Sequence, residues 1–350
     1  MDTRDTAEQA ELRRSARQLA RELGPATVAD LDDATRAKRL SAAVRDAGWL
    51  ELRADGGDGT PLAGGVEAAI VAEALGAAVA DAAFAGPVLA GDLARRAGVQ
   101  VGDGTVVAFA PSLVDLAVVH GGTTAAPLHV IDGGGEVDSG FVLTPEGSGH
   151  RLARLGLDGA DDSSGTGSDL SRSVRTVGAQ APVVVVPDQD RLLTDDDLAL
   201  VRALGLALTS ADLVGVMRGV LDVTVAYAAE RQQYGVPIGS FQAVQHLLAE
   251  ARCLMEGSHS VALHASWAVD NLPPDGALTA GRVAKAYCGR AARTVGETAI
   301  QVHGGIGNTW ECIVNVYLRR ALLSSRWFGD VGEQLRELER TRLGVGDGLS

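Results

Sequence analysis

The hydrophobic periodicity of this 350-residue chain changes twice, and this constrains the fold more than any other feature. From Ala7 to about Gly98, apolar residues recur every three or four positions, which predicts amphipathic helices. From about Gly104 to Asp190, short β-rich runs alternate with Gly, Ser, Asp and Pro clusters, which predicts strands and turns. From Thr194 onward the helical period returns. The predicted order is therefore α, then β, then α.

We predict a mixed α and β fold in three domains. These are an N-terminal α-helical domain (1–103), a small middle β domain (104–190) and a C-terminal α-helical bundle domain (191–350) of four long helices. The expected strands are VVAFA, LAVVHG, LHVIDG, SGFVLTP and APVVVVP, and the interval GSGHRLARLGLDGADDSSGTGSDLSRS is expected to be a loop. In the bundle, 271–279 is expected to be a turn, a helix to run from about Ala280 to Gln301, and a last helix to carry YLRRALLSSRWF.

Charge and cysteine content exclude several classes of function. The chain has 31 basic and 45 acidic residues, a net charge of −14, so its long-range field repels phosphate backbones and anionic membranes. Nucleic-acid binding is therefore not expected. Cys253, Cys288 and Cys312 form no C-x-x-C pair, which favours a reducing, cytoplasmic location. The first residues lack a signal-peptide core, and charges interrupt the apolar runs, so no membrane span is expected.

Motif searches for other chemistries are negative. The sequence has no G-x-G-x-x-G after a predicted strand, no P-loop, no G-x-S-x-G elbow and no H-E-x-x-H. His259 and His264 lie five residues apart, which places them on different faces of a helix. We therefore expect no metal site.

The segment ERQQYGVPIGSFQAVQHLLAE (230–250) is unusual for a connection between helices. A predicted helix ends at Arg231, and Gln242 opens the next helix after a turn rich in Gly and Pro. The planar fork of an arginine suits phosphate oxygens, and the start of a helix offers free N–H groups. The alternative is an arginine that only stabilises the end of a helix dipole.

The segment AIQVHGGIGNTWECIVNVYLRRA (299–321) is the second unusual connection. Gly304 and Gly305 remove side chains where another group must approach the backbone, and Gln301 lies one turn earlier. The alternative is an ordinary helix end followed by a turn.

Together these segments resemble the C-terminal domain of the acyl-CoA dehydrogenase family, whose turns have the patterns R-x-[QT]-[FY]-G-x-P-I-x-x-[FH]-Q and Q-x-x-G-G-x-G. The segment DAGWLELRADGGDG followed by AAIVAEALG resembles that family's N-terminal helices. The resemblance implies FAD as cofactor, bound between two chains, so an oligomer is expected. Arg231 would meet the FAD pyrophosphate across the subunit interface, and the other implied FAD contacts are Gln233, Tyr234, Ile238, Phe241, Gln242, Gln301, Gly304 and Gly305.

The resemblance also implies the reaction, removal of the α-proton of an acyl-CoA by a carboxylate and transfer of a β-hydride to the flavin. In this sequence the two places where family members carry that carboxylate hold Phe328 and Gly205, neither of which accepts a proton. Asp330 and Asp212 are the nearest acids and the candidate bases on this chain, although Asp212 is more simply a helix-face or capping acid. The catalytic base is therefore unassigned. Gly205 and Ala207 would leave room for a bulky acyl group, or would serve ordinary helix packing.

The middle domain departs from the family because VVAFAPS leads directly into LVDLAVV, without the T-E-P-x-x-G-S-D segment that lies beside the flavin ring. The β domain is therefore expected to be truncated. A chain with the dinucleotide turns but neither base resembles one subunit of the α2β2 branch known from actinobacterial steroid side-chain degradation. The implied partners are an acyl-CoA, with a steroid side chain as one option, a second dehydrogenase subunit carrying the base, and an electron-acceptor protein. Two alternatives stay open: a homodimeric flavoprotein with tailoring chemistry, and a non-catalytic acyl-binding or structural paralogue.

Overall fold

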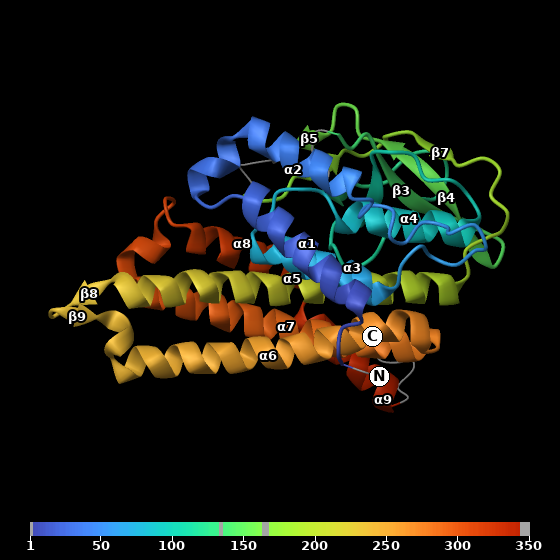
Figure 1. Cartoon of the computed structure of the whole chain (residues 1–350). Helices are drawn as coiled ribbons and strands as arrows, with labels where there is room; N and C mark the ends of the chain where they lie inside the picture. Colours follow the sequence, from blue (N-terminus) through green and yellow to red (C-terminus); the bar gives the residue numbers. More distant parts are fainter. Residues whose placement is uncertain (1–2, 133–135, 163–167, 344–350) are drawn as a thin grey trace.

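The computed structural model describes residues 3–132, 136–162 and 168–343 (Figure 1). It has three parts in chain order: N-terminal helices, a sheet and a helical bundle. The N-terminal helices are α1 (Ala7–Leu23), α2 (Ala34–Asp46), α3 (Gly65–Ala77) and α4 (Ala85–Ala97), with a short 3-10 helix η1 (Val28–Asp32). The mixed α and β fold predicted from the sequence is confirmed.

The described middle part forms a seven-stranded sheet in the order β5-β6-β2-β1-β3-β4-β7. Neighbouring strands are antiparallel except for the parallel pair of β1 with β3. The strands are β1 (Thr105–Phe109), β2 (Leu128–Ile131), β3 (Ser139–Glu146), β4 (Gly149–Gly156), β5 (Asp161–Asp162), β6 (Val174–Val177) and β7 (Val183–Val185). Figure 1 shows α4 lying beside this sheet.

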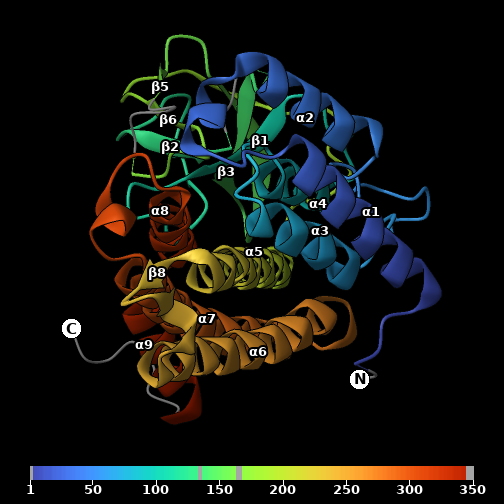
Figure 2. The ribbon, with the colours of Figure 1, turned by 60° about the vertical axis from the view of Figure 1, so that its left-hand side comes forward.

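The C-terminal part is an α-helical bundle built around one long central helix. Its helices are α5 (Asp195–Glu230), α6 (Gln242–Asn271), α7 (Pro274–His303), α8 (Ile313–Arg326) and α9 (Val331–Leu343). Two connections carry local structure: β8 (Gln232–Gln233), β9 (Val236–Pro237) and the 3-10 helix η2 (Ile238–Ser240) follow α5, and the 3-10 helix η3 (Gly304–Asn308) follows α7. Figures 1 and 2 show α5 between the N-terminal helices and sheet on one side and α6 and α7 on the other.

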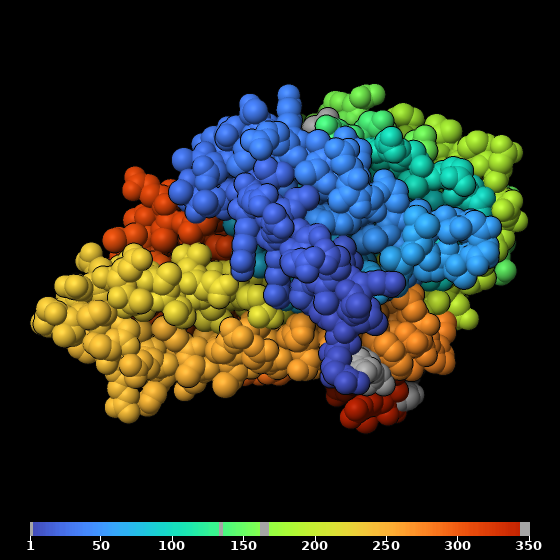
Figure 3. Space-filling model, in the orientation of Figure 1, coloured from blue at the N-terminus to red at the C-terminus, as the bar shows by residue number. Residues whose placement is uncertain are grey.

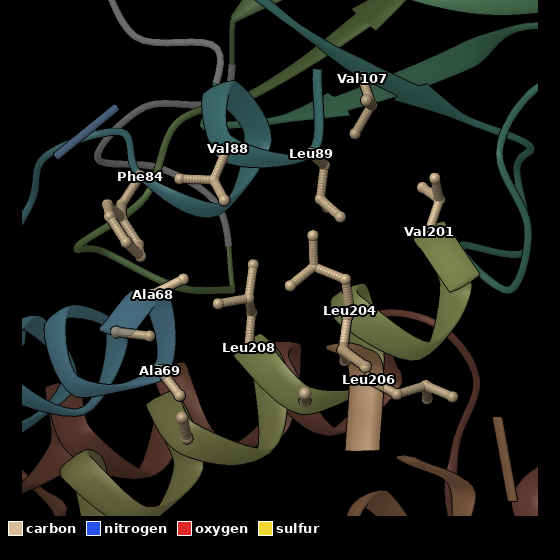
Figure 4. Packing of buried hydrophobic residues seen from close by; sticks show 14 of the residues in the cluster. Ala68, Ala69, Phe84, Val88, Leu89, Val107, Val201, Leu204, Leu206 and Leu208 are labelled. Atoms are coloured by element: carbon tan, nitrogen blue, oxygen red, sulfur yellow. The ribbon is translucent and has the colours of Figure 1, made fainter. Parts of the chain in front are cut away.

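Helix α5 begins where Thr194 caps it, because the Thr194 side chain accepts from Asp197 N–H and the Asp197 carboxylate accepts from Thr194 N–H. It spans 36 residues, about 54 Å at 1.5 Å per residue. By length and composition it could cross a membrane, but 89% of its most apolar window is buried inside the protein, as in a core helix. Figure 4 shows Val201, Leu204 and Leu208 of α5 meeting side chains of α3, α4 and β1.

Four sequence predictions of local structure are corrected. LAVVHG forms only isolated bridges, at Leu116 and Val118, and not a strand. The interval predicted as a loop contains β4, which pairs with β3 along its whole length; residues 163–167 of that interval lie outside the described residues. Helix α7 starts at Pro274, because a proline at the first helical position sacrifices no intrahelical hydrogen bond. Helix α9 was not predicted and adds a fifth helix to the expected four.

The contact between α3 and α5 depends on glycine. A Cβ added to Gly219 would lie 2.1 Å from the carbonyl oxygen of Ala77, and one added to Gly215 would lie 2.1 Å from that of Glu73. A Cβ on Gly76 of α3 would likewise lie 2.5 Å from the carbonyl oxygen of Asp212. The two backbones therefore touch at a distance that no other residue allows.

Replacing Gly219 with Ala should destabilise the protein by at least about 1–3 kcal/mol, because the added methyl group meets rigid backbone. Gly276→Ala in α7 is the matched control: its Cβ would find only ordinary contacts from 3.4 Å outward, so better helix propensity should stabilise by about 0.5–1 kcal/mol. Urea unfolding of both variants measures the difference. Equal effects at the two positions would contradict the close packing of α3 on α5.

Candidate functional site

The structure brings the two unusual connections to one end of the bundle. Arg231 caps the C-terminus of α5, and Gly304 caps that of α7. The rings of Tyr227 and His303, which lie at these helix ends, stack at a centroid distance of 4.2 Å and hold the two ends together. We call this region the bundle tip and define it as residues 231–242 and 301–305. Figures 1 and 2 show it at the end where β8 and β9 project.

The backbone of the tip is open at Gly235, Gly304 and Gly305. Tyr234 and Gly235 both have positive φ, 53° and 80°, which turns the chain between β8 and β9. Gly304 has φ 65° and ψ −141°, a conformation that essentially only glycine adopts. A Cβ on Gly235, Gly304 or Gly305 would meet no atom within 4 Å, so another molecule can approach the backbone there.

Three polar side chains of the tip point outward. Arg231, Gln233 and Gln301 are exposed, and none forms a side-chain hydrogen bond or ion pair within the described part of the chain. Tyr234 is 94% exposed and Phe241 36% exposed, with their rings edge to face at 6.5 Å. Gln242 opens α6, and Ile238 closes the turn by donating its N–H to the Arg231 carbonyl at 2.8 Å. This arrangement offers an arginine fork, two amides and aromatic faces to an anionic, ring-bearing ligand.

The two positions that resemble the family's base positions lie in direct contact. An ideal Cβ on Gly205 of α5 would lie 2.3 Å from Cζ of Phe328, so the ring stands directly over the glycine backbone. Phe328 is 1% exposed, adopts φ 63°, and donates its N–H to the Leu113 carbonyl at 2.8 Å. The expected room for a bulky group beside Gly205 is therefore absent, because Phe328 fills it.

Phe328 belongs to a buried aromatic cluster that we define as Phe109, Trp327 and Phe328. Phe109 comes from β1, and its ring lies edge to face with Trp327 at 5.6 Å and with Phe328 at 5.1 Å. The guanidinium of Arg172 covers the Trp327 ring at 5.5 Å. Nζ of the buried Lys285 donates to the Ser324 and Trp327 carbonyls, which fixes the turn after α8. The cluster closes the space between the sheet and α5.

Asp212 is a buried ion-pair centre and not a helix-face or capping acid. Its Oδ1 accepts from Nη2 of Arg320 at 2.7 Å and pairs with Nη2 of Arg172 at 2.9 Å, and its Oδ2 accepts from Ser324 Oγ at 2.7 Å. Burial raises the pKa of Asp212, but Arg172 and Arg320 outweigh it and lower the pKa to about 2. A carboxylate this weakly basic is a poor proton acceptor. Arg172 lies near the end of the interval predicted as a loop, and no sequence signal marked it.

Asp330, the other candidate base, has a structural role at the start of α9. Its Oδ1 accepts from Glu333 N–H at 2.9 Å, and its own N–H donates to Glu333 Oε2 at 2.8 Å. This reciprocal pair is a helix cap. No cluster of His, Cys, Asp or Glu with metal-binding geometry occurs among the residues that the structure describes.

Comparison with protein families and sequences finds acyl-CoA dehydrogenases. The family model described as "Acyl-CoA dehydrogenase, C-terminal domain" matches residues 205–341. The acyl-CoA dehydrogenase IpdE2 of Mycolicibacterium smegmatis is 37% identical over 156 residues, which cover 44% of this chain and 47% of that protein. The acyl-CoA dehydrogenase FadE34 of Mycobacterium tuberculosis is 34% identical over 219 residues, 60% of this chain and 30% of that protein. The chain thus aligns with less than half the length of these relatives.

Solved structures share the fold over nearly the whole chain. A variant of the Tcur3481–Tcur3483 steroid ACAD has a TM-score of 0.78 and 20% identity, covering 96% of this chain and 98% of that chain. The ChsE4–ChsE5 complex from Mycobacterium tuberculosis has a TM-score of 0.74 and 22% identity, covering 99% of this chain and 100% of that chain. At these identities the likeness establishes the fold.

The contact of Phe328 with Gly205 predicts a non-additive pair of substitutions. Gly205→Ala alone should destabilise by about 1–3 kcal/mol, because its methyl group meets the Phe328 ring. Phe328→Ala alone should cost about 3–5 kcal/mol through the cavity it leaves. In the double variant the methyl group added at position 205 enters that cavity, so Gly205→Ala should then cost almost nothing. Chemical unfolding of the four proteins measures the coupling, and strictly additive costs would show that the ring and the glycine do not touch.

The Asp212 ion pairs predict a defined pH dependence. The pKa falls from 3.8 to about 2 on folding, so the stabilisation is complete above about pH 4 and is lost as the pH falls from 4 towards 2. Asp212→Asn should cost about 3–5 kcal/mol near neutral pH, because Arg320 stays buried without its anion and Arg172 keeps only the more distant Asp132 and Asp169. The difference from wild type should shrink below pH 4. Asp222→Asn, at an exposed position on the same helix, should change stability by less than about 0.5 kcal/mol. A difference that is constant from pH 7 to pH 2 would contradict the ion-pair assignment.

Proposed function

We propose that this chain, which belongs to the acyl-CoA dehydrogenase family, is one subunit of an FAD-dependent enzyme that forms the α,β-double bond of an acyl-CoA. In this proposal the bundle tip holds the adenine and pyrophosphate half of an FAD, and a partner chain supplies the flavin-ring site and the catalytic base. The observation that carries it is the contact of Phe328 with Gly205, since it occupies both base positions with apolar groups.

The bundle tip fits an FAD bound from outside the chain. Arg231 offers two parallel N–H donors to a pyrophosphate, and Gln301 lies beside the open backbone of Gly304 and Gly305. The exposed rings of Tyr234 and Phe241 can pack on the adenine. The bound FAD would supply the acceptor for the hydride that leaves the acyl chain. Because the tip projects from the bundle, its donors can reach a cofactor held by a neighbouring chain (Figure 1).

The interior formed by the described residues does not favour the reaction itself. The α-proton must leave to a base, yet Phe328 and Gly205 carry none, and Asp212 is tied to Arg172 and Arg320. The buried rings of Phe109, Trp327 and Phe328 pack against one another between the sheet and α5, and this packing leaves no room there for a flavin ring or an acyl chain. We therefore place proton abstraction on the partner chain, in an α2β2 assembly.

The substrate class and partner are inferred from the neighbours' names. One structural neighbour is a ChsE4–ChsE5 complex, and another is named a steroid ACAD. These names favour a heteromer that acts on a steroid side-chain CoA thioester. We further propose a cytoplasmic enzyme whose electrons pass to an acceptor protein.

A second candidate is a non-catalytic paralogue that binds no flavin. The closed aromatic cluster favours it, because a chain without a reaction site can fill that space. The unpartnered donors of Arg231 and Gln301 argue against it, since a scaffold needs neither. Flavin content separates the two candidates.

Arg231→Ala, purified with its partner chain, should bind FAD at least about tenfold more weakly, because a charge-assisted contact to the pyrophosphate is lost. Arg231→Lys should lie between wild type and Ala, because it keeps the charge without the fork. Arg39→Ala is the matched control, an exposed arginine of α2 without a side-chain partner among the described residues. Flavin absorbance after gel filtration measures the retained FAD. If Arg231→Ala keeps its full FAD content, the tip does not bind the cofactor.

A further inference from the structure

A second region of the chain gathers arginines that the proposed function does not use. Helices α1, α3, α5 and α8 enclose a groove of about 950 Å³, open solvent included. Its polar lining is Arg17 and Arg21 of α1, Arg218 and Asp222 of α5, and Tyr317 of α8. In Figure 3 the surface is hollowed between α1 and α5. We call this feature the arginine groove.

The groove lies over the carboxylate of Glu73, whose single negative charge is shared by several cationic side chains. Glu73 of α3 is 6% exposed. Its oxygens lie 3.3 Å from Nη1 of Arg13, 3.3 Å from Nη2 of Arg17 and 3.1 Å from Nε of Arg218. Nδ1 of His259, which does not line the groove, lies 3.4 Å from the same carboxylate. One negative charge therefore serves three guanidinium groups.

The remaining acids do not balance this cluster. Asp5 pairs with Arg13 at 2.7 Å and so compensates that one arginine. Burial lowers the pKa of Arg17, and although Glu73 opposes this, repulsion from Arg218 and Arg13 adds to it. Arg21 has no side-chain partner among the described residues. The groove is thus lined by three arginines, Arg17, Arg21 and Arg218, and by one acid, Asp222. Even with the adjacent Glu73 counted, positive charge is in excess there, in a chain of net charge −14.

The arrangement of the arginines suits a tetrahedral oxyanion. Arg17 and Arg21 lie one turn apart on the same face of α1, and Arg218 faces them from α5. Planar guanidinium forks that converge from two helices match the oxygens of a phosphate group. The Tyr317 hydroxyl is committed to the Ala77 carbonyl at 2.8 Å, so the arginines are the donors left for a ligand. Small apolar residues, including Ala77, Ala78 and Pro25, line the rest of the groove and leave room for the body of a phosphate ester.

We propose that the arginine groove binds a phosphate-bearing anion, held by Arg17, Arg21 and Arg218. Arg218 precedes Arg231 by thirteen residues on α5, about 20 Å along the helix, so this site is separate from the bundle tip. The inference goes beyond the proposed function and does not depend on it.

The test uses the full assembled protein and isothermal titration with inorganic phosphate, pyrophosphate and CoA as separate probes. Arg21→Glu is the main variant, because Arg21 makes no contact on which the fold relies. Arg14→Glu is the matched control, since it makes the same charge change on α1 but does not line the groove. If Arg21→Glu does not fold, Arg21→Gln replaces it in the binding test, because it removes the cation without adding an acid.

We expect saturable binding of at least one probe, weakened at least about tenfold by Arg21→Glu and less than about twofold by Arg14→Glu. If pyrophosphate or phosphate binds as tightly as CoA, the ligand is recognised as an inorganic phosphate. If CoA binds more tightly and with the same sensitivity to Arg21, the ligand is a phosphate ester. The proposal is overturned if no probe shows binding that depends on Arg21. It is also overturned if Arg14→Glu loses as much affinity as Arg21→Glu, because equal losses indicate non-specific charge attraction.

Discussion

The rest of the structure depends on the close contact of α5 with α3. Gly215 and Gly219 let the two backbones touch, and this holds a 36-residue helix in the centre of the protein. Each functional feature occupies its own stretch of that helix. Gly205 lies under Phe328, and Asp212 pairs with two arginines. Arg218 faces the arginine groove, and Arg231 caps the C-terminus of the helix at the bundle tip. A shift of α5 against α3 would therefore move all of them together.

The interior and the tip of α5 have opposite physical characters. Around Gly205 and Asp212 the protein is closed, with aromatic rings packed edge to face and the Asp212 carboxylate paired with two arginines. At Arg231 the donors are exposed, and the neighbouring glycines leave the backbone uncovered. Buried space filled by side chains admits no substrate, whereas exposed donors without partners can accept a ligand from another molecule. This contrast is the basis for assigning the chain a contributing role at a site shared with a partner.

Sequence patterns predicted the features that depend on local signals. The ends of α5 predicted from Thr194 and from the turn at Arg231 lie within one residue of the observed ends. The two Gly-containing connections lie at the same end of the bundle. The roles of Arg231 and Gln301 towards FAD stay predictions.

Features that depend on tertiary contacts were missed. Strand β4 contains Gly, His and Arg and is held by pairing with β3. Asp212 was taken for a helix-face or capping acid because Arg172, its partner, is distant in sequence. The filling of the Gly205 space by Phe328 required both chain segments in three dimensions.

We propose that this chain contributes to a flavin site without containing one. This proposal is tested most directly by the FAD-to-chain ratio of the protein purified alone and after co-expression with its partner chain. We expect a colourless protein alone and, in the mixed complex, a flavin spectrum with one FAD shared by each pair of unlike chains. A fully flavinylated protein when purified alone would contradict the proposal, because the closed interior between sheet and α5 could then not be the functional state.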